Sequence, residues 1–261
     1  MTKYWKVWTL TAQNTLQLAF INRWSNALFF FGKVLRFSFA MLFLFIIRQN
    51  VTQFAGYTTD QLIIFFLTYQ FVDLIAQVVY RGVYVFSNYI RNGDFDFILA
   101  QPISPLFRML TNQPDINDTL FIIPTTLLSI WIAFQLDVTI TLASLGWFLL
   151  LLLNSFLIVT AIHVLILCTG ILITQVDGIL WLYRDLSRLG QFPISIYAEP
   201  LRLALFFLVP IGMMVTIPAE YLLNTSPTYS AFIATLVGVL FFLFSLQIWK
   251  YSLRYYTSAS S

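Results

Sequence analysis

Residues 145–174 read LGWFLLLLLNSFLIVTAIHVLILCTGILIT, an unbroken run without a single charged side chain. A helix that crosses a lipid bilayer needs about 20 consecutive, mostly apolar residues, because it must span a hydrocarbon layer about 30 Å thick. The run is also too long for a β-strand, which is typically about 3–10 residues in globular proteins. It therefore predicts a transmembrane helix, and this decides the class of the fold.

The composition of the whole chain points the same way. Of its 261 residues, 59% are hydrophobic and only 10% are charged, whereas soluble domains contain about 45–50% apolar and about 25% charged residues. A single soluble core could not bury this excess, so we expect an integral protein of the lipid bilayer. A single cysteine excludes an internal disulfide, and with only one histidine beside it the chain is too poor in ligands for a His/Cys metal site.

Five further apolar segments resemble the first, and together they predict an all-α polytopic membrane protein with six transmembrane helices in one domain over residues 1–261. Residues 1–24 precede them and predict an amphipathic interfacial helix, because Trp5, Trp8 and Leu16 share one helical face while Lys3 and Lys6 lie opposite. The predicted membrane segments, in chain order, are 27–47, 61–85, 115–136, 145–174, 201–223 and 231–249.

The cationic residues predict the orientation. Cytoplasmic loops of membrane proteins are enriched in Lys and Arg, and a cytoplasmic N-terminus leaves only Arg48 of the 14 cationic residues outside. We therefore expect a multi-pass protein of the inner (cytoplasmic) membrane with both termini in the cytoplasm. The residues predicted at the inner side are Lys3, Lys6, Arg23, Lys33, Arg36, Arg81, Arg91, Arg108, Arg184, Arg188, Arg202, Lys250 and Arg254.

Residues 177–197 admit two interpretations. Their polarity, with Arg184, Asp185 and Arg188, favours a cytoplasmic connector, which leaves 201–223 as the fifth span. In the alternative, 177–197 cross the membrane as a short polar-lined span, and 201–223, interrupted by Pro210 and Pro218, form a re-entrant hairpin that dips in from outside. Both alternatives give six crossings.

The loop after the second span predicts a rigid bend. Gly93 can end one helix, and Ser104 followed by Pro105 suits the N-cap and first residue of a new short helix. The result is a cytoplasmic elbow over Asp94–Met109. It should expose a group of apolar side chains, namely Phe95, Phe97, Ile103, Leu106 and Phe107. Such an elbow either rests among lipid headgroups or serves as a docking knob for a soluble partner.

The same loop carries a family resemblance. The order Ile-Arg-x-Gly-x-x-Asp-x-x-Leu-x-x-Pro resembles the membrane subunits of ABC-2-type exporters, and most closely the branch that pairs two different permeases with a separate ATPase. It is filled by Ile90, Arg91, Gly93, Asp96, Leu99 and Pro102. Residues 192–197, 209–210 and 217–219 are similar to that branch as well. Gln101 departs from it, because a basic residue often stands there.

This resemblance implies a permease subunit of an ATP-driven exporter rather than an enzyme. It implies two copies of an ABC ATPase subunit bound beneath the elbow, and a translocation path shared with a second, related permease chain. ATP and Mg²⁺ would be held by the ATPase, so no cofactor, resident metal or nucleic-acid partner is expected on this chain. The elbow would act as a coupling helix, with ATPase-coupling residues Asp94, Phe95, Asp96, Phe97, Pro102, Ile103, Leu106, Phe107 and Arg108.

Two charged residues lie at similar depth in the first two spans. Charges inside a membrane are costly and are usually functional or paired, so we predict an ion pair between Arg36 and Asp73. Alternatively, Arg36 and Lys33 extend to the inner headgroups while Asp73 bonds to a neighbouring helix.

Two other function classes remain as alternatives. Asp73 could carry protons in a stand-alone, ion-coupled secondary transporter. The pairs Asp94/Asp96 and Asp115/Asp118 could hold Mg²⁺ in a membrane-embedded transferase, although such enzymes need richer acidic clusters, and Asp115 and Asp118 better suit the N-terminal cap of the third span.

Overall fold

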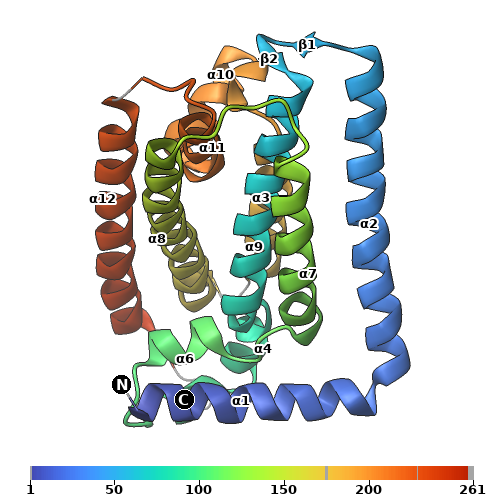
Figure 1. The fold of residues 1–261 in the computed structure, drawn as a ribbon. Helices are drawn as coiled ribbons and strands as arrows, with labels where there is room; N and C mark the ends of the chain where they lie inside the picture. The colour runs from blue at the N-terminus through green and yellow to red at the C-terminus, as the bar shows by residue number, and fades with distance from the viewer. Residues whose placement is uncertain (1, 174–175, 228, 258–261) are drawn as a thin grey trace.

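The computed structural model describes residues 2–173, 176–227 and 229–257, and these are almost entirely helical (Figure 1). By length and hydropathy, five of the described helices can each cross a membrane, and a sixth span is added if one bent helix pair is included. The five are α2 (Arg23–Asn50), α3 (Thr59–Val79), α7 (Ile116–Ala133), α8 (Leu142–Ile173) and α12 (Tyr229–Ser252). The predicted class, an all-α polytopic membrane protein, is confirmed.

The five helices overlap the first, second, third, fourth and sixth predicted segments, and the second differs most at its end. The second span was expected to run to Val85, but α3 ends at Val79 and a 3₁₀ turn, η1 (Arg81–Val85), follows it. The expected end of the fourth span, Thr174, lies outside the described residues.

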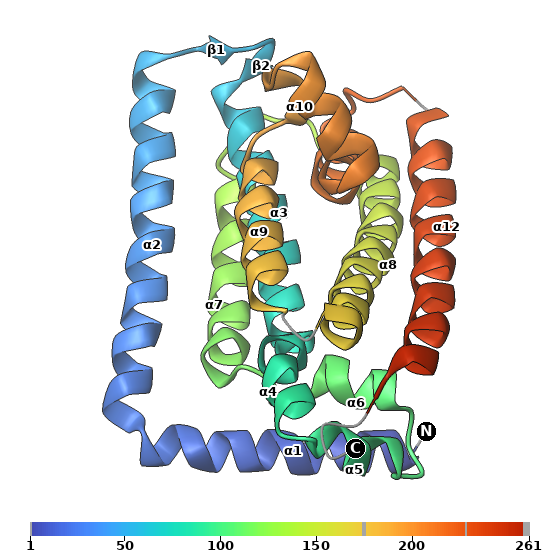
Figure 2. The same cartoon turned by 180° about the vertical axis from the view of Figure 1, so that it is seen from behind.

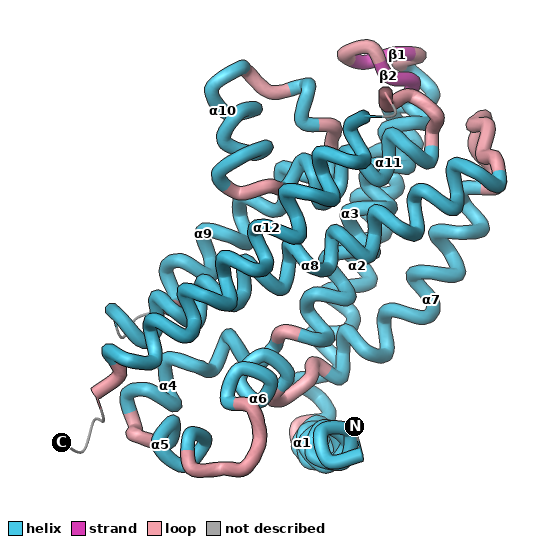
Figure 3. Tube along the Cα trace, turned by 90° about the vertical axis from the view of Figure 1, so that its left-hand side faces the viewer, coloured by secondary structure: helices cyan, strands magenta, loops and turns pink. Residues whose placement is uncertain are grey.

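Helix α1 (Thr2–Ile21) lies across one end of the bundle, and Figure 3 shows it end-on beside α6 (Pro105–Thr111). Its Thr11 is buried against the bundle, whereas Trp5 and Leu16 stay exposed. The opposite end carries a small hairpin of β1 (Gln53–Phe54) and β2 (Tyr57–Thr58), joined antiparallel with Gln53 opposite Thr58. We call these the α1 end and the hairpin end.

Residues 177–197 do not form a connector at one end of the bundle. Just before their start, the Val176 amide donates over 3.1 Å to Ser87 Oγ, which lies on the short helix α4 (Phe86–Arg91) at the α1 end. Near their finish, the Ser195 hydroxyl lies 3.5 Å from the Tyr57 hydroxyl at the hairpin end. Between these points run α9 (Asp177–Arg188), η2 (Leu189–Gln191) and η3 (Ile194–Ile196), alongside α3 (Figure 2). The segment thus runs from one end of the bundle to the other, as in the alternative interpretation.

The expected fifth span over 201–223 is not formed as a single helix. Residues 199–208 and 212–222 instead form two segments that meet at 76°. Pro210 lies at the bend, where its missing N–H and its ring prevent a continuous helix. The segments are α10 (Glu199–Leu203) with the π-turn η4 (Ala204–Leu208), then the π-turn η5 (Gly212–Thr216) with α11 (Ile217–Leu222).

Both arms of this bent pair belong to the hairpin end. Glu220 accepts a hydrogen bond from the Tyr57 hydroxyl at 2.9 Å, and Asn224 donates to the carbonyl of Thr139 at 3.0 Å, in the loop between α7 and α8. Helix α10 lies at the same end (Figure 1), which places Arg202 with Arg48 rather than with the cationic residues of the α1 end. The structure therefore corrects the predicted position of Arg202, and Arg184 and Arg188, which were also predicted at the inner side, lie on α9 within the segment that runs across the bundle.

The C-terminal helix packs closely on α8 because its facing side chains are small. Ala231, Ala234 and Gly238 of α12 are all buried, as is usual where membrane helices approach each other. The Asn154 side chain of α8 donates to the Ala234 carbonyl over 3.0 Å, which adds a polar link between the two helices.

Candidate functional site

The elbow after α3 forms as its turn residues predict. Helix α4 (Phe86–Arg91) stops before Gly93, whose φ of +76° lies in the left-handed region that glycine adopts without strain. Helix α5 (Asp94–Leu99) follows, and a short loop leads to α6. The Ser104 hydroxyl accepts a hydrogen bond from the Phe107 amide at 3.4 Å, with Pro105 as the first helical residue. The sequence therefore fixes two short helices at the α1 end.

Phe95 was predicted to be exposed on this elbow, and that prediction is wrong. Its side chain is fully buried, with ring centroids 5.2 Å from Phe86 and 5.1 Å from Tyr256 in edge-to-face geometry. Burial, reinforced by the Asp96 carboxylate, raises the pKa of Tyr256 to about 12, so its ring packs on Phe95 in the neutral form at physiological pH. Phe95 therefore anchors the elbow and the C-terminal segment to the bundle.

Helix α1 holds the second half of the elbow. The Lys3 ammonium donates to the carbonyl of Pro102, and Arg108 donates to the Thr11 hydroxyl over 2.6 Å. The Phe107 ring meets Tyr4 edge-on, with centroids 4.9 Å apart. Three of the predicted coupling residues, Pro102, Phe107 and Arg108, thus join the elbow to α1.

The other residues that were predicted to couple to the ATPase differ in how exposed their side chains are. Asp94 is exposed, and Phe97 is 72% exposed, more than any other apolar side chain on the elbow. Asp96, Ile103 and Leu106 are half-buried rather than exposed. The surface that remains open on α5 is therefore centred on Phe97, with Asp94 close by in sequence on the same short helix.

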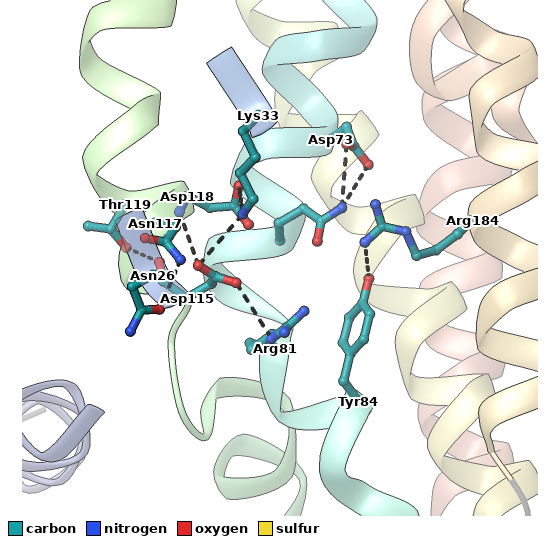
Figure 4. Close-up of polar contacts among 11 residues, drawn as sticks. Asn26, Lys33, Asp73, Arg81, Tyr84, Asp115, Asn117, Asp118, Thr119 and Arg184 are labelled. Carbon is teal, nitrogen blue, oxygen red and sulfur yellow. Dashed lines mark hydrogen bonds and ion pairs between the residues drawn. The ribbon is translucent and has the colours of Figure 1, made fainter. Parts of the chain in front are cut away.

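Above the elbow, charged side chains from three helices form a cluster. Lys33 of α2 lies 2.6 Å from Asp118 and 3.7 Å from Asp115, and Arg81 lies 3.7 Å from Asp115 (Figure 4). Asp115 also caps α7 by accepting from the Asp118 amide at 3.1 Å, as predicted. These contacts tie α2 to the start of α7 and to the turn after α3.

The predicted partners Arg36 and Asp73 border one cavity of about 680 Å³ next to this cluster. No ion pair joins them in the described part of the chain. Instead, the Gln77 amide donates to Asp73 at 3.4 Å. Next to this cavity it is Lys33 of α2 that forms ion pairs, and Arg48 of the same helix pairs with Asp60 at the hairpin end. Among the described residues, no group of three or more His, Cys, Asp or Glu side chains is arranged to hold a metal ion.

The family of the chain follows from a comparison of its sequence with protein-family models. The model of the ABC-2 family transporter protein matches residues 34–260, which is most of the chain. The chain belongs to the ABC-2 transporter family. Neither a curated protein nor a solved structure matches it.

Members of the ABC-2 transporter family are membrane transport subunits that work in the context of an ABC transporter with an ATPase partner. The matched range includes the elbow and, of the charged cluster, Arg81, Asp115 and Asp118, whereas Lys33 lies just before its first residue. The resemblance seen in residues 90–102 is thereby confirmed for the chain as a whole. The elbow of this ABC-2 protein, which carries the residues of that resemblance, is therefore its candidate functional site.

Sequence reasoning missed two features of this ABC-2 protein. The first is the charged cluster, although Lys33 and the pair Asp115/Asp118 were visible as charges at the inner ends of two predicted spans. The second is the role of Arg184, which donates to the Tyr84 hydroxyl over 2.6 Å from α9. The sequence feature that could have indicated this role is the polarity of residues 177–197. That polarity suggested a loop, because the sequence does not show that Tyr84 lies beside Arg184.

Proposed function

We propose that this chain is the transmembrane permease subunit of an ATP-binding-cassette exporter. It forms half of the translocation path, and ATPase subunits bind to it at the α1 end through the elbow. The observation that carries this proposal is the open apolar surface at Phe97 on a rigid elbow in an ABC-2 family chain. A projecting apolar side chain that enters a groove is a common mode of docking between proteins.

The proposed orientation puts the α1 end in the cytoplasm. Arg48 and Arg202 lie at the hairpin end. Apart from Arg202, the Lys and Arg residues that were predicted on the cytoplasmic side lie in elements of the α1 end or in the spans. This asymmetry supports cytoplasmic termini in the inner (cytoplasmic) membrane. In this arrangement 177–197 make the fifth crossing, and the bent pair 199–222 is re-entrant from outside.

The proposed assembly contains two ATPase copies and a second, related permease. Within their most hydrophobic windows, α2 is only 17% buried and α12 only 22%, so both present apolar faces to their surroundings. Lipid covers such faces in part, and a second permease chain would cover the rest. ATP and Mg²⁺ belong to the ATPase in this scheme, and this chain supplies the path and its coupling surface.

The alternatives predict different behaviour of the purified chain. A secondary transporter that uses Asp73 would move its substrate with no ATPase present, and a transferase would show turnover that depends on Mg²⁺. A pull-down of the tagged chain from native membranes tests the main proposal. We expect an ABC ATPase among the co-purifying chains, together with a second permease. Vectorial flux by the chain alone in liposomes would contradict it.

The docking surface itself is tested by Phe97→Asp. A carboxylate at a site that a partner's groove must enclose leaves a buried, unpaired charge, so we expect ATPase association to weaken at least about tenfold. Co-purification of the ATPase with the tagged chain measures the effect. Phe97 suits this test better than Phe107, because a substitution at Phe107 would also disturb its contact with Tyr4.

Phe134→Asp is the matched control. Phe134 is 82% exposed at the end of α7, in the loop where the Asp137 amide bonds to Asp60 at the hairpin end. The same chemical change there should leave ATPase binding intact. Equal recovery of the ATPase with both variants would mean that α5 only rests among lipid headgroups.

A further inference from the structure

The polar cavity next to the charged cluster is open on one side and is lined by residues of α1, α2, α3, η1, α7 and α9. Its volume of about 680 Å³ falls in the range of sites that hold small molecules, about 300–1,000 Å³. Four cationic and three acidic side chains border it, which is an unusual density for a chain with 10% charged residues. These are Lys33, Arg36, Arg81, Arg184, Asp73, Asp115 and Asp118.

Within the described chain, these charges fall into two groups. The first group is the cluster of Lys33, Arg81, Asp115 and Asp118, whose ion pairs satisfy one another. The second group consists of Arg36, Asp73 and Arg184, and none of these forms an ion pair with a described residue. Among the described residues, Asp73 accepts a hydrogen bond only from Gln77, at 3.4 Å, and Arg184 donates to the neutral Tyr84 hydroxyl (Figure 4).

Charges in membrane-spanning segments are costly unless they are paired, hydrated or engaged by a ligand. Here two guanidinium groups and one carboxylate face the same cavity, without neutralising one another by direct contact. Guanidinium groups bind phosphate and carboxylate oxygens in a bidentate manner. A carboxylate in the same cavity suits an ammonium group. The complementary ligand therefore carries one anionic and one cationic group.

A second cavity adjoins the first and is mainly apolar. It has a volume of about 260 Å³ and shares Ala19, Asn26, Ile116 and Asn117 with the first cavity. Its other walls are mostly apolar, formed by Leu16, Phe20, Ala27, Phe30 and Leu120, with Arg23 at its edge. A ligand that fills both cavities would have a zwitterionic group in the first and a hydrocarbon part in the second, which is the structure of a zwitterionic amphiphile.

We propose that this pair of cavities binds a zwitterionic amphiphile. Its phosphate or carboxylate lies against Arg36 and Arg184, its ammonium group lies against Asp73, and its apolar part extends into the smaller cavity. The same chemistry belongs to a phospholipid headgroup of the ethanolamine type and to a transported compound with an amine and an acid. The binding site does not depend on the proposed ATPase docking, and it can be tested on the chain alone.

The experiment uses the full chain in nanodiscs or mild detergent, with binding followed by native mass spectrometry. The probes are dihexanoyl phosphatidylethanolamine, dihexanoyl phosphatidylglycerol, which lacks the amine, and free phosphoethanolamine, which lacks the chains. We expect the ethanolamine lipid to bind about tenfold more tightly than the glycerol lipid, because only its amine meets Asp73. Asp73→Asn should remove this preference, whereas Arg36→Gln should weaken both lipids about tenfold.

Arg202→Gln is the control, since Arg202 lies at the hairpin end and pairs with Glu199, three residues before it. It should leave the affinity for both lipids unchanged.

Arg36→Gln is the decisive variant because the Arg36 side chain is exposed and is not needed for packing. The melting temperature of each unliganded variant checks that the variant folds. Phosphoethanolamine that binds as tightly as the lipid would assign the site to a soluble zwitterion, and binding of the lipid alone would assign it to a headgroup with its chains. Equal affinity of the wild type for both lipids, or unchanged binding by Arg36→Gln, would overturn the proposal.

Discussion

Replacement of Gly82 by alanine is expected to push α6 away from η1 and to destabilise the protein by about 3 kcal/mol, at the upper end of the usual cost of overpacking. A Cβ atom at this position would lie only 2.0 Å from the Met109 carbonyl oxygen and 2.9 Å from the Asn112 amide nitrogen. Both contacts are backbone atoms of buried residues, so no side-chain rotation can relieve the overlap. The two segments must separate, and the packing around Met109 is lost.

The melting temperature in detergent, followed by size-exclusion chromatography, measures this effect. Gly146→Ala in α8 is the matched control, because a Cβ there meets nothing within 4 Å and alanine favours a helix over glycine. We expect that control to melt at the wild-type temperature or slightly above it. Since α6 is half of the elbow, Gly82→Ala should also reduce ATPase co-purification in the same preparations. Identical melting curves for the two variants would show that η1 and α6 are not packed as described.

The spans could be predicted because their signal is local. Runs such as 145–174 need no knowledge of their neighbours, since hydrophobicity and length alone indicate a membrane helix. The turn residues of the elbow are equally local, and Gly93 and Ser104 act as predicted. The interruption at Pro210 could be predicted in the same way, because proline cannot continue a helix. Only the structure shows that the two segments on either side of it meet at 76°.

The predictions that failed depended on what surrounds a residue. Phe95 and Phe97 are two residues apart in a short helix, and their types do not reveal which one faces the bundle. In the structure Phe95 packs on Phe86 and Tyr256, while Phe97 is left open. The path of 177–197 was ambiguous for the same reason, because Arg184 looks like a loop residue until Tyr84 of another segment is placed beside it.

The ion pair was misassigned within a single helix. Lys33 and Arg36 lie three residues apart on α2, close enough that both border the same cavity. The estimated depth of Arg36 in the membrane matched that of Asp73 and suggested that these two residues pair. In the structure Lys33 forms the ion pairs instead, because the N-cap Asp115 and the first-turn residue Asp118 of α7 lie next to it. Helix-to-helix register decides such a contact, and register cannot be derived from the sequence of either helix.

Lys33→Met is therefore expected to destabilise the chain by about 3 kcal/mol, the usual low-end cost of removing one partner of a buried ion pair. Asp118 is only 3% exposed, and Lys33 is its cation at 2.6 Å. The methionine keeps most of the side-chain length but leaves the Asp118 carboxylate buried without its charge partner. Asp115 is affected less, since Arg81 still lies 3.7 Å from it. The melting temperature and the resistance to unfolding by detergent measure the loss.

The combination of Lys33→Met with Asp118→Asn separates a charge effect from a packing effect. Removal of the buried carboxylate takes away the uncompensated charge, so the double variant should recover a large part of the stability lost by Lys33→Met alone. Arg202→Met serves as control, because its pair with Glu199 is exposed at the hairpin end and such pairs contribute at most about 1 kcal/mol. If the double variant were as unstable as the sum of its single changes, Lys33 would act through its aliphatic chain, and the link between α2 and α7 would be one of packing rather than charge.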